Sequence, residues 1–211
     1  MVKKRTALEP QRRHGRLRVA ALLQAGTAVI AERGYEAATM AEIAQRAGAQ
    51  IGSLYRFFPN KEILAEALMK RFGEHIREAF GRIDSKLDTL SITGLADALL
   101  SLLVVEFRGE ATAVIALLEA RSDWSAKRWE FHDSFLKHVA RTLRSYRPRL
   151  SRGTASDMAF VLLQNMRIMW EVKSEQLGEV GPGVVDELCE MNRLYLASKL
   201  ARRPNAPKRR R

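Results

Sequence analysis

Cysteine is nearly absent from this chain of 211 residues, and the single cysteine, Cys189, excludes an internal disulfide. Such cysteine usage suits a reducing compartment. Long apolar runs are absent too: none approaches the length of a membrane span, and the N-terminus lacks the apolar core of a signal peptide. We therefore expect a cytoplasmic protein without a membrane partner.

The sequence also lacks the residue patterns of metal sites and of catalysis. His132 and His138 are six residues apart, on different sides of an expected helix, and no cysteine cluster accompanies them. No glycine-rich loop suited to cradling a phosphate is present. Acidic pairs such as Glu187 and Glu190 are typical of a solvated helix face. The sequence predicts no metal, no cofactor and no enzyme activity.

Strand-like alternation of apolar and polar residues occurs nowhere over a useful length. Apolar residues instead recur at helical spacing, and Gly and Pro separate the periodic segments. This pattern predicts an all-α fold. The expected helices cover residues 17–33, 39–47, 51–58, 60–85, 93–107, 111–121, 126–146, 154–173 and 184–200.

Positive charge is unevenly distributed along the chain, whose formal net charge is +12. Residues 1–60 hold ten Lys or Arg and four Asp or Glu, residues 61–201 hold twenty of each, and residues 202–211 hold six Lys or Arg and no acid. The basic ends indicate contact with a polyanion, whereas the balanced middle indicates another task. We expect a flexible basic arm and a disordered basic tail, each either a solvated end or an added contact to nucleic acid.

The segment from Thr39 to Lys61 carries the signals of two short helices joined by a tight turn. Thr39 can cap the first helix, and Glu42, three residues later, can complete a capping box. Gly48 stands where a left-handed residue ends a helix, and Pro59 ends the second helix. This order is typical of a helix-turn-helix unit, whose second helix lies in the DNA major groove.

The second helix of this unit has an apolar side and a polar side. Leu54 and Phe58, four residues apart, form the side that faces inward. The other side can donate hydrogen bonds to phosphates and base edges. Its residues are Gln50, Ile51, Ser53, Tyr55 and Arg56.

Linked motifs make this region resemble a known family. The motifs are Gly34 with Tyr35, residues 39–48 and residues 52–62. Across residues 17–72 the sequence is similar to the N-terminal DNA-binding domain of the TetR family of one-component transcriptional repressors. Two residues depart from the family pattern, since Gln50 replaces a better helix cap such as Ser and Ala49 replaces a larger aliphatic residue.

The resemblance implies a role for each outward residue. Arg56 is expected to contact a guanine, while Thr39, Tyr55 and Lys61 are expected to hold phosphates. Phe57 stands where a polar aromatic residue is frequent and is expected to press on a thymine methyl group or a sugar. The expected DNA-contacting set is Thr39, Gln50, Ile51, Gly52, Ser53, Tyr55, Arg56 and Lys61.

Three longer helices are expected to control and pair the DNA-reading unit. The helix over residues 60–85 belongs to both parts of the chain, so tilting it would move the reading helix. The helix over residues 154–173 is apolar around more than half of its circumference, and the helix over 184–200 is similar. We expect these two to pack against their copies in a homodimer, because two reading helices must lie roughly 34 Å apart. The alternative is that both are buried within one chain.

Aromatic and thioether residues of the larger part are expected to line a cavity for a small-molecule effector. In the family, such a ligand commonly releases DNA. Each residue taken singly is also explained as ordinary core, and Trp124 and Trp129, near a helix junction, are the best candidates. The expected lining is Phe107, Trp124, Trp129, Phe135, Met166 and Trp170.

The expected organisation is a basic arm over residues 1–16, a three-helix DNA-binding domain over 17–62, a larger helical ligand-binding and dimerisation domain over 63–200, and a tail over 201–211. The expected function is a ligand-responsive repressor that binds a pseudo-palindromic operator as a homodimer. Three alternatives stay open: an activator or nucleoid-type DNA binder without a ligand, a helical enzyme whose hairpin is only scaffold, and a module that binds a foreign partner through its broad apolar helices.

Overall fold

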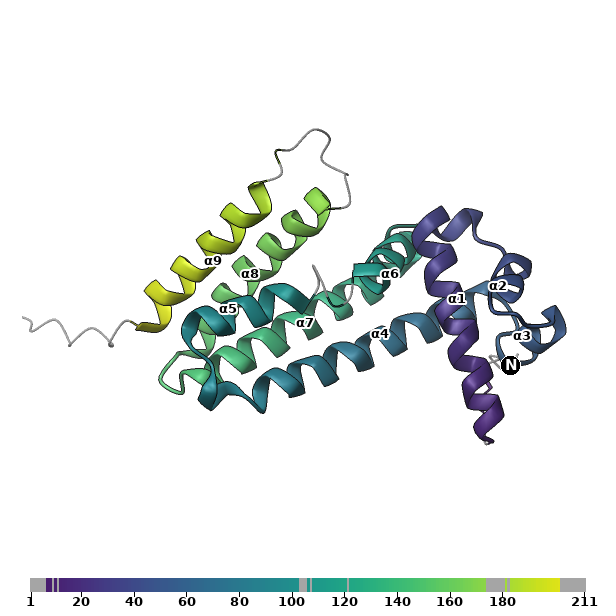
Figure 1. Cartoon of the computed structure of the whole chain (residues 1–211), viewed down its shortest axis with the longest axis horizontal. Helices are drawn as coiled ribbons and strands as arrows, with labels where there is room; N and C mark the ends of the chain where they lie inside the picture. Colours follow the sequence, from purple (N-terminus) through teal and green to yellow (C-terminus); the bar gives the residue numbers. More distant parts are fainter. Residues whose placement is uncertain are drawn as a thin grey trace, which may run out of the picture. The chain divides into compact units, whose positions relative to one another are not determined.

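A computed structural model describes residues 7, 8, 10, 12–102, 106, 108–120, 122–173, 181 and 183–201. Every regular element in these ranges is helical, which confirms the all-α expectation (Figure 1). Phe107 and all of the predicted tail except Ala201 lie outside the described residues. The α-helices are α1 (Arg13–Ala37), α2 (Met40–Arg46), α3 (Ile51–Phe57), α4 (Lys61–Asp84), α5 (Ile92–Ser101), α6 (Arg108–Ala120), α7 (Ser125–Tyr146), α8 (Arg152–Lys173) and α9 (Val184–Ala201), with short 3-10 turns η1 (Leu87–Thr89) and η3 (Ser122–Trp124).

The chain divides into two compact units, which do not follow the predicted domains 17–62 and 63–200. Unit 1 comprises Met1–His75 and Arg108–Phe131, and unit 2 comprises Ile76–Phe107 and His132–Arg211. Helices α4 and α7 each contribute residues to both units. The difference arises because α6, distant in sequence, packs along α1 and so joins the N-terminal unit.

Helix α1 begins at Arg13, four residues before the expected start and inside the predicted basic arm. The residue that precedes it, Arg12, makes no side-chain cap, so the sequence carried no start signal there. Helical geometry is interrupted at Gly34, whose φ of 76° lies in the left-handed region. Glycine adopts this conformation without the strain that a side chain adds, so the helix stops where the sequence predicted.

The core of unit 1 is built from apolar residues that recur at helical spacing on five helices. None of the following side chains is more than 2% exposed: Leu22, Val29 and Ile30 of α1, Ile43 of α2, Leu54 of α3, Leu64 of α4 and Leu117 of α6. Burying each such side chain stabilises the fold by roughly 1.5 to 3 kcal/mol. Tyr35 packs against Trp124 with ring centroids 6.2 Å apart, which confirms it as a core residue.

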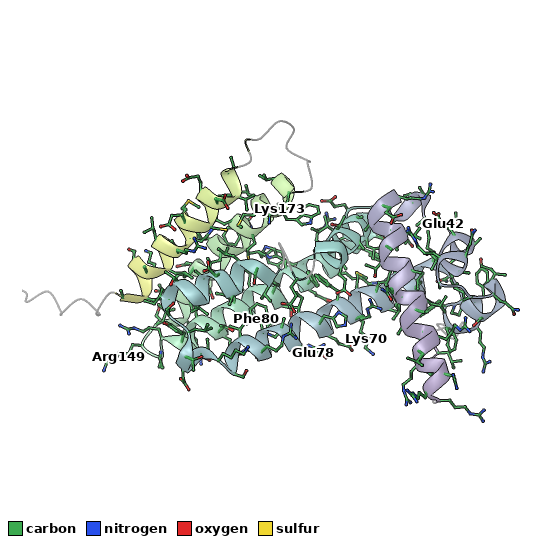
Figure 2. All side chains as sticks on the ribbon, in the orientation of Figure 1. Glu42, Lys70, Glu78, Phe80, Arg149 and Lys173 are labelled. Carbon is green, nitrogen blue, oxygen red and sulfur yellow. The ribbon has the colours of Figure 1, made fainter. Side chains whose placement is uncertain are left out.

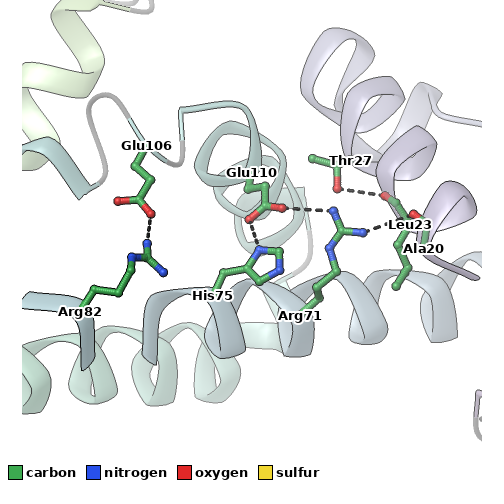
Figure 3. Close-up of polar contacts among 8 residues, drawn as sticks. All are labelled: Ala20, Leu23, Thr27, Arg71, His75, Arg82, Glu106 and Glu110. Atoms are coloured by element: carbon green, nitrogen blue, oxygen red, sulfur yellow. Dashed lines mark hydrogen bonds and ion pairs between the residues drawn. The ribbon is translucent and has the colours of Figure 1, made fainter. Parts of the chain in front are cut away.

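A polar cluster joins three helices of unit 1 (Figure 3). Glu110 of α6 accepts from Arg71 Nη2 at 3.1 Å and lies 2.9 Å from His75 Nδ1, both on α4. Arg71 also donates to the carbonyl oxygen of Ala20 on α1 at 3.4 Å. A carboxylate shared between two donors fixes α6 against α4 more firmly than one exposed ion pair does.

Unit 2 packs α9 against both α8 and α5. The fully buried Asn192 of α9 accepts from Asn165 of α8 at 2.8 Å, and Arg193 Nε bonds Asp97 of α5 at 2.7 Å. Phe80, labelled in Figure 2, meets Phe135 of α7 edge to face. Helix α5 ends at Ser101, and Leu102 and Glu106 beyond it have π-helical geometry.

None of the helices within the described ranges combines the length and apolar character that a membrane span requires.

Candidate nucleic-acid interface

Local signals in the sequence set the helix-turn-helix geometry of unit 1. Thr39 caps α2, and its hydroxyl accepts from the backbone N–H of Glu42 at 3.2 Å. Gly48, with φ of 58°, turns the chain after α2, as predicted. The N–H of Ala49 then bonds the carbonyl of Ala44 at 2.9 Å, which closes the helix end. Asn60 caps α4 by accepting from the N–H of Ile63 at 2.8 Å.

The capping box forms only in part. The carboxylate of Glu42 lies 2.7 Å from Arg33 Nε of α1 and makes no bond back to Thr39. A second pair between the same helices joins Arg46 to Glu32 at 2.6 Å, and the hydrogen bond from Arg46 lowers the pKa of Glu32. These two pairs hold α2 on α1, where the sequence alone predicted a local contact.

Helix α3 presents a polar face on an apolar anchor. Leu54 is fully buried and Phe58 is 2% exposed, so the inward residues are confirmed. Tyr55 and Ile51 are about half exposed, at 48% and 43%. Gln50, Gly52 and Arg56 are exposed and Ser53 is partly exposed. The outward face therefore consists of the predicted residues, and their contacts to DNA stay a prediction.

Phe57 corrects the expectation for this face. Its side chain is only 8% exposed, so it is part of the anchor and cannot press on a thymine methyl group or a sugar. The guanidinium of Arg56 lies 6.0 Å from the centroid of its ring. Phe57 thus supports the residue expected to read a base, as a weak cation–π contact.

Lys61, expected to contact a phosphate, makes three hydrogen bonds within unit 1, and its contact to DNA stays a prediction. Its ammonium donates to the carbonyl oxygens of Tyr35, Glu36 and Ala38 at 2.8, 3.0 and 3.2 Å. An ammonium has three donors, and these carbonyls use all three. The nitrogen also lies 4.5 Å from the centre of the Tyr35 ring. Lys61 therefore ties the start of α4 to the end of α1.

Replacing Lys61 with methionine is expected to destabilise unit 1 by about 1 to 3 kcal/mol, because three carbonyls lose a charged donor. Chemical unfolding monitored by circular dichroism measures the change, and the exposed Lys86→Met variant is the control. An unchanged unfolding curve, together with a salt dependence of DNA binding weakened by about one phosphate contact per chain, would restore the original expectation.

The predicted contact of Thr39 with a phosphate stays a prediction. The residue is exposed, and its hydroxyl oxygen is used as an acceptor within the helix cap. A hydroxyl group also has one donor hydrogen. Capping and phosphate contact are therefore compatible at this position.

Two contacts that the sequence did not predict hold the ends of α3. The N–H of Leu8 donates to the carbonyl of Phe57 at 3.1 Å, at the C-terminal end of the helix. The guanidinium of Arg18 donates to the carbonyl of Gly48 at 3.2 Å, before its N-terminal end. Both join residues 30 or more positions apart, so no local pattern reveals them.

The five described residues that are expected to line an effector cavity fall in different units, and their role stays a prediction. Trp124, 2% exposed, packs on Tyr35 in unit 1, and Trp129, also in unit 1, is 68% exposed. The other described members, Phe135, Met166 and Trp170, are buried in unit 2. Helical spacing identified them as apolar but could not tell which unit each would join.

An open cavity of about 820 Å³ lies in unit 1. Its apolar lining includes Leu8, Val19, Leu23, Phe58 and Ile63, from the N-terminal segment, α1, the end of the hairpin and α4. Within the described ranges, no group of three or more His, Cys, Asp or Glu is placed to hold a metal ion.

Comparison with known proteins agrees with this geometry. Residues 22–68 match the model of the bacterial regulatory proteins of the tetR family. The HTH-type transcriptional repressor KstR of Mycolicibacterium smegmatis is 38% identical over 74 residues, which cover 35% of this chain and 32% of that repressor. The chain thus matches about a third of the length of this curated relative.

Solved structures extend the likeness to the whole fold. A transcriptional regulator of Aquifex aeolicus, 18% identical, superposes with a TM-score of 0.67 over 86% of this chain and 99% of that one. The regulator FadR of Bacillus subtilis, solved with stearoyl-CoA, is 21% identical, with a TM-score of 0.59 over 85% of this chain and 97% of that one. The helix-turn-helix hairpin thus lies in the segment, residues 22–68, that is similar to the tetR family of bacterial regulatory proteins, and the whole chain has the fold of the solved regulators.

Proposed function

We propose that this protein is a transcriptional repressor that binds a pseudo-palindromic operator as a homodimer and releases it when a small molecule binds. The observation that carries the proposal is the exposed face of α3, with Arg56, Tyr55 and Gln50 presented on a buried anchor. Amide and guanidinium groups recognise base edges in the major groove, and hydroxyl groups hold phosphates. The repressor activity of the similar protein KstR supports the direction of regulation.

The pairing of two chains is supported by an exposed apolar surface in unit 2, which we call the α8–α9 face. Its members are Phe160, Val161 and Ile168 of α8 and Met191 and Leu194 of α9, each between 38% and 62% exposed. The two helices pack on each other. Apolar patches of this kind mark interaction surfaces. A second copy would cover this one and hold two α3 helices in successive major grooves, roughly 34 Å apart.

The effector site is proposed in unit 2. Phe135, Met166 and Trp170 are its candidate lining, since all three are buried there, and Trp124 and Trp129, which belong to unit 1, stay separate predictions. The solved FadR with stearoyl-CoA supports a ligand that carries an apolar chain. A protein that regulates transcription acts in the cytoplasm, which we propose as its location.

Selection of bound duplexes from a random pool tests the function. The purified chain is expected to enrich an inverted repeat, and a screen of apolar metabolites against the enriched duplex is expected to find one that lowers its affinity. Enrichment of no sequence would overturn the regulator proposal. Enrichment without any releasing compound would leave a DNA-binding regulator that has no effector.

A further inference from the structure

Unit 2 carries a run of positive charge that the balanced total over residues 61–201 conceals. Between Asp133 and Asp157 the sequence contains six Lys or Arg and no acidic residue. Five of the six are arginines at the end of α7, in the turn that follows it and at the start of α8. We call these five the α7–α8 arginine cluster. Its members are Arg141, Arg144, Arg147, Arg149 and Arg152.

Hydrogen bonds fix the backbone that carries the cluster on both sides of the turn. Before the turn, the hydroxyl of Thr142 donates to Asp84 at 2.6 Å, and the hydroxyl of Tyr146 donates to the carbonyl oxygen of Leu90 at 3.1 Å. After the turn, Ser151 caps α8, and its hydroxyl accepts from a backbone N–H three residues later at 3.1 Å. The cluster therefore stands on a scaffold held at both ends.

The arginine side chains lie on the outer side of this scaffold. Arg141, Arg149 and Arg152 are exposed, and Arg144 and Arg147 are partly exposed. Figure 2 shows Arg149 directed away from the helices at this end of unit 2. The Nε atom of Arg144 is buried and has no hydrogen-bond partner among the described residues. An unsatisfied buried donor costs free energy, so the stability of the fold does not explain its place.

Carboxylates neutralise other arginines of unit 2 but not those of the cluster. Arg193 Nε lies 2.7 Å from Asp97 Oδ1, and Arg167 Nε lies 2.8 Å from Glu171 Oε1. In the part of the chain that the structure describes, no carboxylate forms an ion pair with a member of the cluster. The positive charge of the cluster is therefore uncompensated within these residues.

This uncompensated charge acts on its surroundings. Arg141 donates to Nδ1 of His138 at 2.9 Å, and this ring nitrogen brings no negative charge. Burial lowers the pKa of His138, and the positive charges of Arg141 and Arg77 lower it further, while Asp84 opposes them. Helix α8 has no acidic residue in its first turn, although a helix N-terminus disfavours cations such as Arg152. Positive charge thus gathers here at a cost to the fold, which indicates an anionic partner.

The surroundings of the cluster indicate which kind of anion fits. From residue 132 to residue 159 no large apolar side chain is exposed, and the nearest exposed ones are Trp129 and Phe160. Membrane surfaces and protein partners are held mainly by apolar side chains that become buried on binding. Phosphate groups need no apolar anchor, and the planar guanidinium group binds them through two parallel hydrogen bonds. The cluster therefore favours phosphates.

The extent of the cluster suits a duplex better than a single phosphate group. Six residues separate Arg141 from Arg147, a rise of about 9 Å along a helix. A DNA duplex carries one phosphate charge per roughly 1.7 Å of its axis, so about five phosphate charges lie along this length. A ligand with one phosphate would engage only part of the cluster.

We propose that the α7–α8 arginine cluster binds the phosphates of a second DNA duplex, without reading its sequence, while α3 reads the operator. The proposal rests on the proposed function, since it needs a dimer that is bound to an operator. Contacts to phosphates are sensitive to salt and carry no sequence information. A homodimer carries two clusters, so an operator-bound repressor would hold further DNA beside its operator.

The test asks whether the operator-bound protein captures a second duplex. A short operator duplex is immobilised and saturated with the full chain, which occupies the reading helices, and a labelled duplex of shuffled sequence is added at about 50 to 200 mM salt. The unaltered chain is expected to capture it. R141Q/R149Q/R152Q is expected to lower this affinity on the order of 10-fold or more. The slope of log affinity against log salt should fall by about 2 to 3 per chain, at about 0.9 per phosphate contact.

Two further variants separate the cluster from charge in general and from fold. R82Q/R128Q/R167Q removes the same charge from exposed arginines outside the cluster and is expected to reduce the slope by less than about one. R141K/R149K/R152K keeps the charges and is expected to retain most of the capture. All variants should bind the immobilised operator and share one circular dichroism spectrum.

Equal losses in the two glutamine variants, or no capture by the operator-bound unaltered chain, would overturn the proposal while the regulator reading stands. Sodium triphosphate and phosphatidylserine vesicles replace the labelled duplex in parallel experiments. Binding of either one without capture of the duplex would also overturn the proposal and assign the cluster to a small polyphosphate or to a lipid surface. Failure of the unaltered chain to bind any operator would overturn the proposed function itself.

Discussion

Replacing Ile168 and Leu194 with glutamate is expected to separate the protein into monomers and to lower operator affinity on the order of 100-fold or more. The two side chains are 40% and 62% exposed and lie on α8 and α9 of the α8–α9 face. A carboxylate buried in an apolar interface loses its hydration without gaining a partner, so the paired state is disfavoured. A lone chain then binds one half-site and loses the high effective concentration of its partner.

Analytical ultracentrifugation measures the pairing, and fluorescence anisotropy measures affinity for the full operator. The matched control replaces Ala120 and Ala126, both exposed in unit 1, with glutamate and should leave both measurements unchanged. Dimers that persist in the first variant would assign pairing to another surface. Monomers with undiminished affinity would show that operator binding does not require two chains.

Replacing Arg56 with alanine is expected to cost about 1 to 3 kcal/mol on the preferred operator, roughly 5- to 150-fold in affinity. Arg56 is exposed on α3, and its guanidinium lies 6.0 Å from the centroid of the buried Phe57 ring. Guanidinium groups read guanine through two parallel hydrogen bonds, which alanine cannot form. Preference is therefore expected to be lost at one base pair in each half-site and retained elsewhere.

Selections from a random pool with the variant and the unaltered chain measure this change base pair by base pair. Arg46→Ala is the control, because it removes one charge from the same unit and breaks a pair with Glu32. The control is expected to keep its base preferences, whatever its affinity. An unchanged preference in the Arg56 variant would remove the base-reading role from this residue.

The ends of the hairpin helices were predictable from the sequence because the signals that set them are local. Three residues mark where α2 and α3 begin or end, and each acts within a few residues of its own position. They are Thr39 with its capping hydroxyl, Gly48 with its left-handed backbone and Pro59. The alternation of anchor and outward residues on α3 follows from helical spacing alone. These signals do not depend on the rest of the fold.

Contacts between distant segments explain what was missed. Lys61 appeared available for a phosphate because nothing local shows that its ammonium meets the carbonyls of Tyr35, Glu36 and Ala38. No local pattern shows that Trp124 packs on Tyr35, nearly ninety residues earlier. The early start of α1 was missed because Arg12 carries no capping group. Helical spacing predicts that a residue is apolar or polar, and tertiary packing decides its neighbour.

The central claim is that the outward face of α3 enters the major groove of the operator. Photo-crosslinking tests it most directly, with a photoreactive amino acid at Ser53 and, as a control, at the exposed Lys137 of unit 2. Irradiation on the enriched duplex is expected to join position 53 to bases within each half-site and position 137 to none. Cross-linking from position 53 to no base of a duplex that the protein binds tightly would contradict the account.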